Sequence, residues 1–158
     1  MGNPTRLSEH VRVEIRPPIA ILTLDRPDKR NALDGGTVGA LGDFFGDPPP
    51  DVAAAVLSSS GEHFSAGLDL SELTTTSVFE GVVHSRNWHD QFDRIQFGRV
   101  PVVSVLRGAV IGGGLELAIA THVRVAEPSA YYALPEGSRG IFVGGGASMR
   151  LPRLVGVH

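Results

Sequence analysis

A triple glycine between a predicted strand and a predicted helix is the first feature of this sequence that could support chemistry. Gly112–Gly114 follows the apolar run Val102–Leu106 and opens a helical pattern. Glycines at this position let a ligand approach the backbone, and the start of a helix offers unpaired N–H groups. Such a turn suits an anion, or a carbonyl oxygen that becomes one. Spacing alone does not separate this interpretation from tight packing of the helix against a sheet.

Glu116 is the first acid with a chemical context. It follows Gly113 by three residues, which places it on the same helical face one turn later. Its sequence neighbours are apolar, so the helix is expected to bury it. Burial raises the pKa of a carboxyl group, as a general acid or base near neutral pH requires. The alternative is a structural ion pair with a buried arginine such as Arg107 or Arg124.

A second acid and a second glycine turn occur elsewhere in the chain. Glu136 lies in the sequence Ala-Leu-Pro-Glu-Gly, where proline and glycine favour a turn. Taken alone, it is better explained as part of a solvated turn or as an acid at a helix start than as a catalytic group. Ser65–Leu70 contains a glycine before a short helical pattern, and its alternative interpretation is an ordinary capped turn. Two acids and two glycine turns together would allow acid–base chemistry beside a carbonyl oxygen.

Strand-like and helix-like segments alternate along the chain and must position these residues. Apolar or alternating runs predict strands at 10–16, 19–25, 52–57, 100–106 and 123–126. Helical patterns are expected at 37–45, 78–97, 112–121 and 147–154. This alternation predicts an α/β fold. The expected core contacts of the second helix are Phe79, Val82, Val83, Trp88, Phe92 and Ile95.

Composition excludes several other classes of protein. A chain of 158 residues fits one domain, and its net charge of −3 with scattered basic residues argues against nucleic-acid binding. No uncharged apolar run reaches the ~18 residues of a membrane span. Because the chain has no cysteine, disulfides and thiolate chemistry are excluded. His84 and His89 are poorly spaced for a metal, so no metal site is expected. With no apolar leader segment either, we expect a cytoplasmic protein.

Four stretches of the sequence resemble the crotonase superfamily, also called the enoyl-CoA hydratase/isomerase family. They match the family in order and spacing, and they are Ile19–Leu33, Gly61–Leu73, Arg107–Ala126 and Leu134–Gly156. The resemblance implies an α/β fold of the crotonase (ClpP-like) type. Its expected form is a spiral of ββα units, with two roughly perpendicular sheets flanked by helices.

The resemblance also implies roles for individual residues. An oxyanion hole would be formed by the backbone N–H groups of Leu68 and Gly113. The two hydratase glutamates fall on Glu116, which would orient and activate water, and Glu136, which would donate a proton to Cα. The implied substrate-binding residues are Lys29, Arg30, Ala32, Ala66, Gly67, Asp69 and Gly144.

The function implied by the resemblance is hydration of a 2-enoyl-CoA to a 3-hydroxyacyl-CoA. Enoyl-CoA isomerisation, hydrolysis or C–C cleavage of another acyl-CoA, and an inactive CoA-binding fragment are the alternatives. No separate cofactor is expected, because coenzyme A enters as part of the substrate. Residues 1–158 would form the N-terminal catalytic core without the family's helical C-terminal part. A full-length chain would assemble as a homotrimer or hexamer, and neither nucleic acid nor a membrane is an expected partner.

Overall fold

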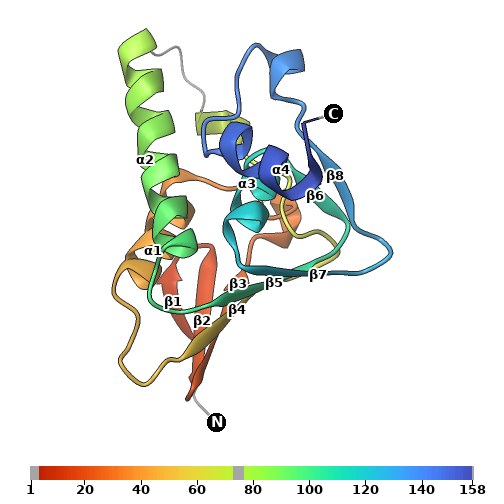
Figure 1. The fold of residues 1–158 in the computed structure, drawn as a ribbon. Coiled ribbons are helices and arrows are strands. Elements are labelled where there is room, and N and C mark those ends of the chain that lie inside the picture. Colours follow the sequence, from red (N-terminus) through yellow and green to blue (C-terminus); the bar gives the residue numbers. More distant parts are fainter. Residues whose placement is uncertain (1–3, 73–76, 158) are drawn as a thin grey trace.

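The computed structural model describes residues 4–72 and 77–157, which fold into two sheets and a set of covering helices (Figure 1). The strands are β1 (Thr5–Ser8), β2 (Val11–Arg16), β3 (Ile19–Leu24), β4 (Ala54–Ser59), β5 (Val102–Leu106), β6 (Ala109–Ile111), β7 (Val123–Ala126) and β8 (Tyr131–Ala133). The α-helices are α1 (Gly35–Gly46), α2 (Val78–Gln96), α3 (Gly113–Ala120) and α4 (Ala147–Val155). Three short 3-10 helices are η1 (Pro27–Lys29), η2 (Leu70–Glu72) and η3 (Glu136–Arg139). The α/β prediction is confirmed.

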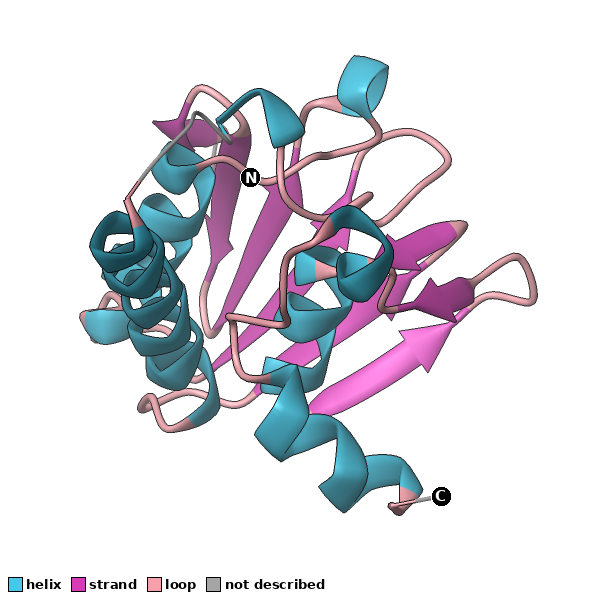
Figure 2. Ribbon diagram, turned by 90° about the horizontal axis from the view of Figure 1, so that it is seen from above, coloured by secondary structure: helices cyan, strands magenta, loops and turns pink. Residues whose placement is uncertain are grey.

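The larger sheet has six strands in the order β1-β2-β3-β4-β5-β7. β1, β2 and β3 pair antiparallel, whereas β3, β4, β5 and β7 run parallel. Parallel neighbours require crossover connections, and α1 and α2 lie in two of them (Figure 2). The loops that carry most of the candidate residues therefore follow the carboxyl ends of the parallel strands.

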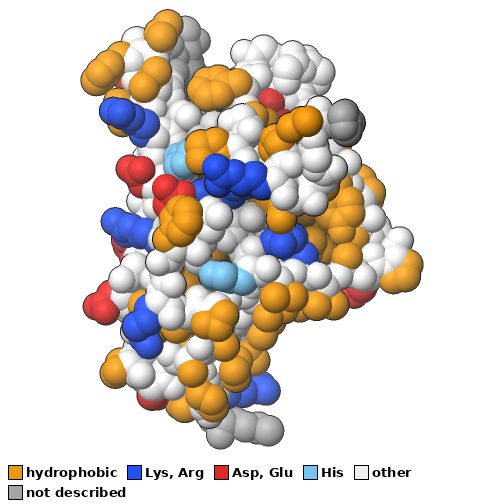
Figure 3. Space-filling model, in the orientation of Figure 1, with side chains coloured by type: hydrophobic (Ala, Val, Ile, Leu, Met, Phe, Trp, Pro, Cys, Tyr) orange, Lys and Arg blue, Asp and Glu red, His pale blue; other side chains and the backbone are white. Residues whose placement is uncertain are grey.

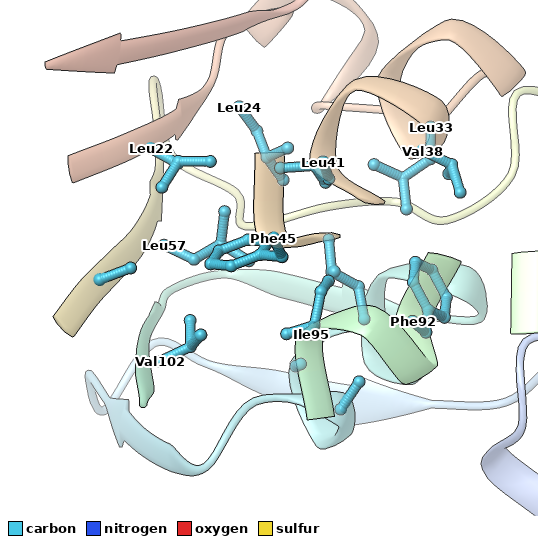
Figure 4. Close-up of a cluster of buried hydrophobic side chains, with 14 of the residues drawn as sticks. Leu22, Leu24, Leu33, Val38, Leu41, Phe45, Leu57, Phe92, Ile95 and Val102 are labelled. Carbon is cyan, nitrogen blue, oxygen red and sulfur yellow. The ribbon is translucent and has the colours of Figure 1, made fainter. Parts of the chain in front are cut away.

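The apolar core lies between the larger sheet and the helices α1 and α2. Leu22 and Leu57 from the sheet meet Phe45 of α1 and Ile95 of α2 in this core (Figure 4). All four side chains are at most 2% exposed. Asp34 caps the start of α1, since its side chain accepts a hydrogen bond from the Thr37 N–H.

The core predicted for α2 is half wrong. Trp88, Phe92 and Ile95 are buried as expected, but the apolar residues of its first turns are exposed: Phe79 is 75%, Val82 47% and Val83 50% exposed. This end of α2 extends beyond the sheet, and apolar side chains gather there on the surface (Figures 1 and 3). Periodicity identified a shared helical face, but it did not reveal how far the core reaches along that face.

A second, two-stranded sheet pairs β6 with β8 in parallel. Neither of these three-residue strands was predicted, because so short a run shows too little periodicity to detect. The four-residue β1 was also missed, whereas β7, of the same length, was predicted at 123–126. β6 leads directly into α3, so this small sheet fixes the start of the helix that carries Glu116. Within residues 4–72 and 77–157, no helix is both long and apolar enough to cross a membrane.

Candidate active site

A cavity of about 330 Å³ lies where the two glycine turns, α2 and the segment before α4 meet. Seven of the eleven sequence-predicted site residues line it together: Ala66, Gly67, Leu68, Gly113, Glu116, Glu136 and Gly144. Apolar side chains from four other segments complete its wall: Leu70, Trp88, Ile111, Ile141 and Phe142. The cavity therefore has a largely apolar wall, into which the two acids and the side chains of His84, Ser85 and Arg139 are set.

The first glycine turn is built around Gly67. Its φ of +90° lies in the left-handed region, which favours glycine. A Cβ at this position would lie 2.7 Å from the carbonyl oxygen of Ile111, so no side chain fits. Buried Ser65 holds the turn, since its Oγ accepts from Gly67 N at 3.1 Å and donates to Asn31 O at 2.8 Å. The two glycine turns thus touch through their backbones.

The second glycine turn joins β6 to α3. Gly112 has a φ of +52° and donates its N–H to Ala133 O of β8 at 2.8 Å. Gly113 then starts α3, and a Cβ on it would lie 3.5 Å from Leu68 N and 2.7 Å from the Trp88 ring. Among the residues described, the N–H groups of Leu68 and Gly113 have no protein acceptor. Two free donors therefore lie close together on the cavity wall.

Glu116 is 3% exposed, and the first residue of α4 donates a hydrogen bond to its carboxylate. Its Oε1 accepts the Ala147 N–H at 3.0 Å. Burial raises the pKa of this carboxyl group and the charge of Glu136 adds to that effect, while the backbone N–H groups and the charge of Arg150 oppose it. The group therefore holds a proton more tightly than a solvated glutamate does, as acid–base chemistry requires.

The predicted alternative for Glu116, an ion pair with Arg107 or Arg124, is wrong. Arg107 approaches Glu127 instead, with Nε and Oε1 3.6 Å apart. Arg124 donates to backbone carbonyl oxygens at the end of α3. Glu116 is thus not neutralised by either of the arginines nearest to it in the sequence.

Glu136 lies opposite the second glycine turn, at the start of η3. It is 8% exposed, so the alternative of a solvated turn is wrong. Its Oε1 would lie 2.8 Å from a Cβ on Gly112, and its buried Oε2 has no hydrogen-bond partner among the residues described. An unpartnered buried carboxylate oxygen is costly to the fold. Buried polar atoms without a hydrogen-bond partner are rare in folded proteins, and a functional role is one explanation for them.

Four predicted substrate-binding residues do not line the cavity: Lys29, Arg30, Ala32 and Asp69. Lys29 and Arg30 are exposed at the end of η1, and the Arg30 carbonyl accepts the Ala66 N–H at 2.9 Å. This loop is therefore bonded to the first glycine turn. The predicted contacts of these residues with a substrate stay predictions.

Asp69 has partners within the protein. Hydrogen bonds from Ser71 N and Oγ, and one from Arg26 at 2.6 Å, lower the pKa of Asp69 to about 2. The ionised carboxylate thus ties the end of the first glycine turn to η2 and to the loop before η1.

Two residues that sequence reasoning did not place at the site are Trp88 and Arg150. Trp88, expected only in the core, both packs on Gly113 and lines the cavity. Arg150 lies behind the segment before α4, is 5% exposed and donates to Gly145 O at 2.6 Å. A lone arginine in a helix carries no sequence signal of burial. Within the described ranges, no cluster of three or more acidic or histidine side chains could hold a metal ion.

Comparison with known proteins gives consistent matches over the chain. The family model described as enoyl-CoA hydratase/isomerase matches residues 14–158. The short-chain-enoyl-CoA hydratase of Clostridium acetobutylicum is 33% identical over 151 residues, which are 94% of this chain and 58% of that protein. The chain thus spans little more than half the length of this relative.

Solved structures agree with the sequence matches. A crystal structure from Rhodopseudomonas palustris superposes with a TM-score of 0.91 at 56% identity, covering 99% of this chain and 60% of that one. The enoyl-CoA hydratase from Thermoplasma volcanium superposes with a TM-score of 0.86 at 33% identity, covering 94% and 60% respectively. The expected spiral α/β fold is confirmed.

Proposed function

The chain belongs to the enoyl-CoA hydratase/isomerase family, and from that premise we propose that it adds water across the 2,3 double bond of a 2-enoyl-CoA, giving a 3-hydroxyacyl-CoA. One observation carries the proposal. Two buried glutamates line the same cavity as two backbone N–H donors that have no acceptor within residues 4–72 and 77–157. Hydration of a conjugated thioester needs this combination, because charge develops on the carbonyl oxygen while water loses a proton as it adds to Cβ and a proton is delivered to Cα.

The N–H groups of Leu68 and Gly113 bind the thioester oxygen in this proposal. When water adds at Cβ, the electrons of the double bond move toward the carbonyl and an enolate forms. Fixed donors that point at this oxygen lower the barrier, and removing one typically costs about 10²–10³ in rate. Gly113 adds the partial positive charge at the start of α3.

The two glutamates divide the proton transfers. Glu116 orients water and accepts one of its protons as the oxygen bonds to Cβ. Glu136 donates a proton to Cα when the enolate collapses. Exchange of the proton between the two carboxyl groups or with solvent restores the starting state, so the net reaction is addition of one water molecule. The raised pKa of Glu116 makes it a stronger base than a solvated carboxylate.

Coenzyme A enters this scheme only as part of the substrate, and no separate cofactor takes part. Lys29, Arg30, Ala32 and Asp69 are proposed to contact the coenzyme A portion, and the bond from the Ala66 N–H to the Arg30 carbonyl joins their loop to the first glycine turn. The homotrimeric or hexameric assembly and the cytoplasmic location stay predictions. Sedimentation analysis of the purified chain tests the assembly.

Isomerisation of a 3-enoyl-CoA to a 2-enoyl-CoA is the second candidate, because the family model includes isomerases. The same cavity would serve, with one glutamate moving a proton between two carbons of the substrate. Product analysis separates the two reactions, since only hydration incorporates oxygen from water.

The test is incubation of the purified 158-residue chain with crotonyl-CoA and longer 2-enoyl-CoA thioesters. We expect 3-hydroxyacyl-CoA as the product. Glu136→Gln is expected to lower kcat by about 10²–10⁴. The matched control is Glu9→Gln, which changes an exposed glutamate distant in sequence from Glu136 and should leave kcat unchanged. A folded wild-type chain that converts a 3-enoyl-CoA but hydrates no 2-enoyl-CoA would establish the isomerase instead.

A further inference from the structure

Arg150 of α4 is a charged side chain inside the protein that the proposed chemistry does not yet use. It is 5% exposed. Its guanidinium donates to Gly145 O at 2.6 Å, to Gln96 Oε1 at 2.6 Å and to the Asp93 carboxylate. A buried arginine persists only where its charge and its donors are matched in this way. The side chain therefore ties α4 and the preceding loop to α2.

The loop that Arg150 holds also holds Glu116. Arg150 binds the carbonyl of Gly145, and the N–H of Ala147 binds Glu116 Oε1 at 3.0 Å. A Cβ on Gly145 would lie 2.9 Å from Glu116 Oε2 and 2.8 Å from the Phe92 ring. The loop is clamped between the arginine on one side and the glutamate on the other, so a displacement of the loop displaces the carboxylate.

We propose that Arg150 is a positioning residue for Glu116: it fixes the segment Gly145–Ala147, where α4 begins, in the place from which that segment holds the carboxylate toward the cavity. This inference rests on the proposed function, because it assigns the placement of the group that activates water. The planar guanidinium is suited to the task, since it binds three acceptors from two segments at fixed angles. A lysine ammonium carries the charge but cannot reproduce this fork.

The charged groups around Glu116 determine the sign of the expected effect. Glu136 and Arg139 face the cavity from η3, Arg150 lies behind the loop on α4, and α2 contributes His84 at the cavity and His89 and Asp93 beside Arg150. The positive charge of Arg150 lowers the pKa of Glu116, against the larger effect of burial. Its removal should therefore raise that pKa further.

The experiment compares Arg150→Gln and Arg150→Lys with Arg153→Gln, which changes an exposed arginine of the same helix. The pH profile of kcat/KM for crotonyl-CoA hydration is measured for each. For Arg150→Gln we expect the acid limb to move up by about half a pH unit or more, with kcat down about tenfold and KM within about twofold. In Arg150→Lys the acid limb of the pH profile should stay close to that of the wild type, because the positive charge is kept, but kcat should fall. Arg153→Gln should match the wild type in both respects.

Carbon-13 NMR of the glutamate carboxyl groups provides a readout that does not depend on turnover. The Glu116 resonance is assigned by its loss in Glu116→Gln, and its titration is followed in the wild type and in both Arg150 variants. A folded Arg150→Gln chain with an unmoved titration and an unmoved acid limb would overturn the inference. If Arg150→Gln does not fold, an Arg150→Lys chain that equals Arg153→Gln in kcat and in titration would overturn it as well. A wild type that hydrates nothing defeats the proposed function, while the titration still decides the role of Arg150.

Discussion

The turn from Ala66 to Leu70 and the turn from Ile111 into α3 share one plan. Each has a glycine at positive φ, then a backbone N–H without a protein acceptor among the described residues, and then an acid. The acids, however, have opposite environments. Asp69 accepts hydrogen bonds from Ser71 and Arg26, whereas Glu116 faces the cavity.

This difference appears in the pKa of each acid. Hydrogen bonds lower the pKa of Asp69 to about 2, while burial raises the pKa of Glu116. An acid that is stabilised as an anion fixes a turn, because it gains nothing from taking up a proton. An acid that is destabilised as an anion takes up a proton more readily than a solvated carboxylate does. Similar local sequence thus serves structure at one turn and, in our proposal, chemistry at the other.

The largest expected effect is on catalysis by variants of the two acids. Glu116→Gln should lower kcat for enoyl-CoA hydration by about 10²–10⁴, because a proton acceptor is lost. Asp69→Asn should lower it by less than about tenfold, since it loosens the first turn but removes no group that transfers a proton in the proposed reaction. Steady-state kinetics with crotonyl-CoA measure both. Equal losses in the two variants would contradict the division of roles.

The next effect concerns the backbone of the turns. Gly67→Ala places a Cβ 2.7 Å from Ile111 O at a φ that alanine rarely adopts. Displacement of the Leu68 N–H should lower kcat/KM by about 10²-fold. Gly39→Ala is the control, because a Cβ there meets nothing within 4 Å. A Gly67→Ala chain with full activity would mean that Leu68 N–H does not bind the thioester.

The pH dependence of stability should have opposite signs at the two acids. The raised pKa of Glu116 means that its contribution to stability is present at low pH and is lost as pH rises through that pKa. The lowered pKa of Asp69 makes its contribution present above its ordinary pKa and lost as pH falls toward about 2.

Melting temperatures across pH test this sign difference. The melting temperature of Glu116→Gln, measured relative to that of the wild type, should rise by about 2–4 °C as the pH increases from about 4 to about 8. Asp69→Asn should melt about 5 °C lower at neutral pH and approach the wild type in strong acid. Parallel curves for the two variants would show that the acids do not differ in the way described.

The smallest effect is expected from Ser71→Ala, which removes the hydroxyl that donates to Asp69 Oδ1 at 2.7 Å. The variant should lose about 1 kcal/mol of stability at neutral pH and leave kcat within about threefold. Ser148→Ala, at an exposed site in α4, is the control. Denaturant unfolding measures the difference. A loss of activity that exceeds the loss of stability would assign Ser71 a part in the reaction.

Local patterns predicted most of the elements and part of the site. Apolar, alternating and helical runs identified β2, β3, β4, β5, β7, α1, α2, α3 and α4 within a few residues, and all of these except β7 are at least five residues long. The strands β6 and β8 are too short for that, although they fix the start of α3. The apolar residues of the first turns of α2 were expected in the core and are exposed, because a period does not reveal what covers a face.

The sequence by itself determined where the backbone could turn tightly and where an acid would follow. Glycine at positions 67 and 112 and the acids at 69 and 116 are local facts, and positive φ depends mainly on residue type. Only the tertiary structure decided which acid would face the cavity. Arg26 reaches Asp69 across 43 positions, and Arg150 reaches Asp93 across 57. Such contacts arise when packed elements meet, and no local period encodes them.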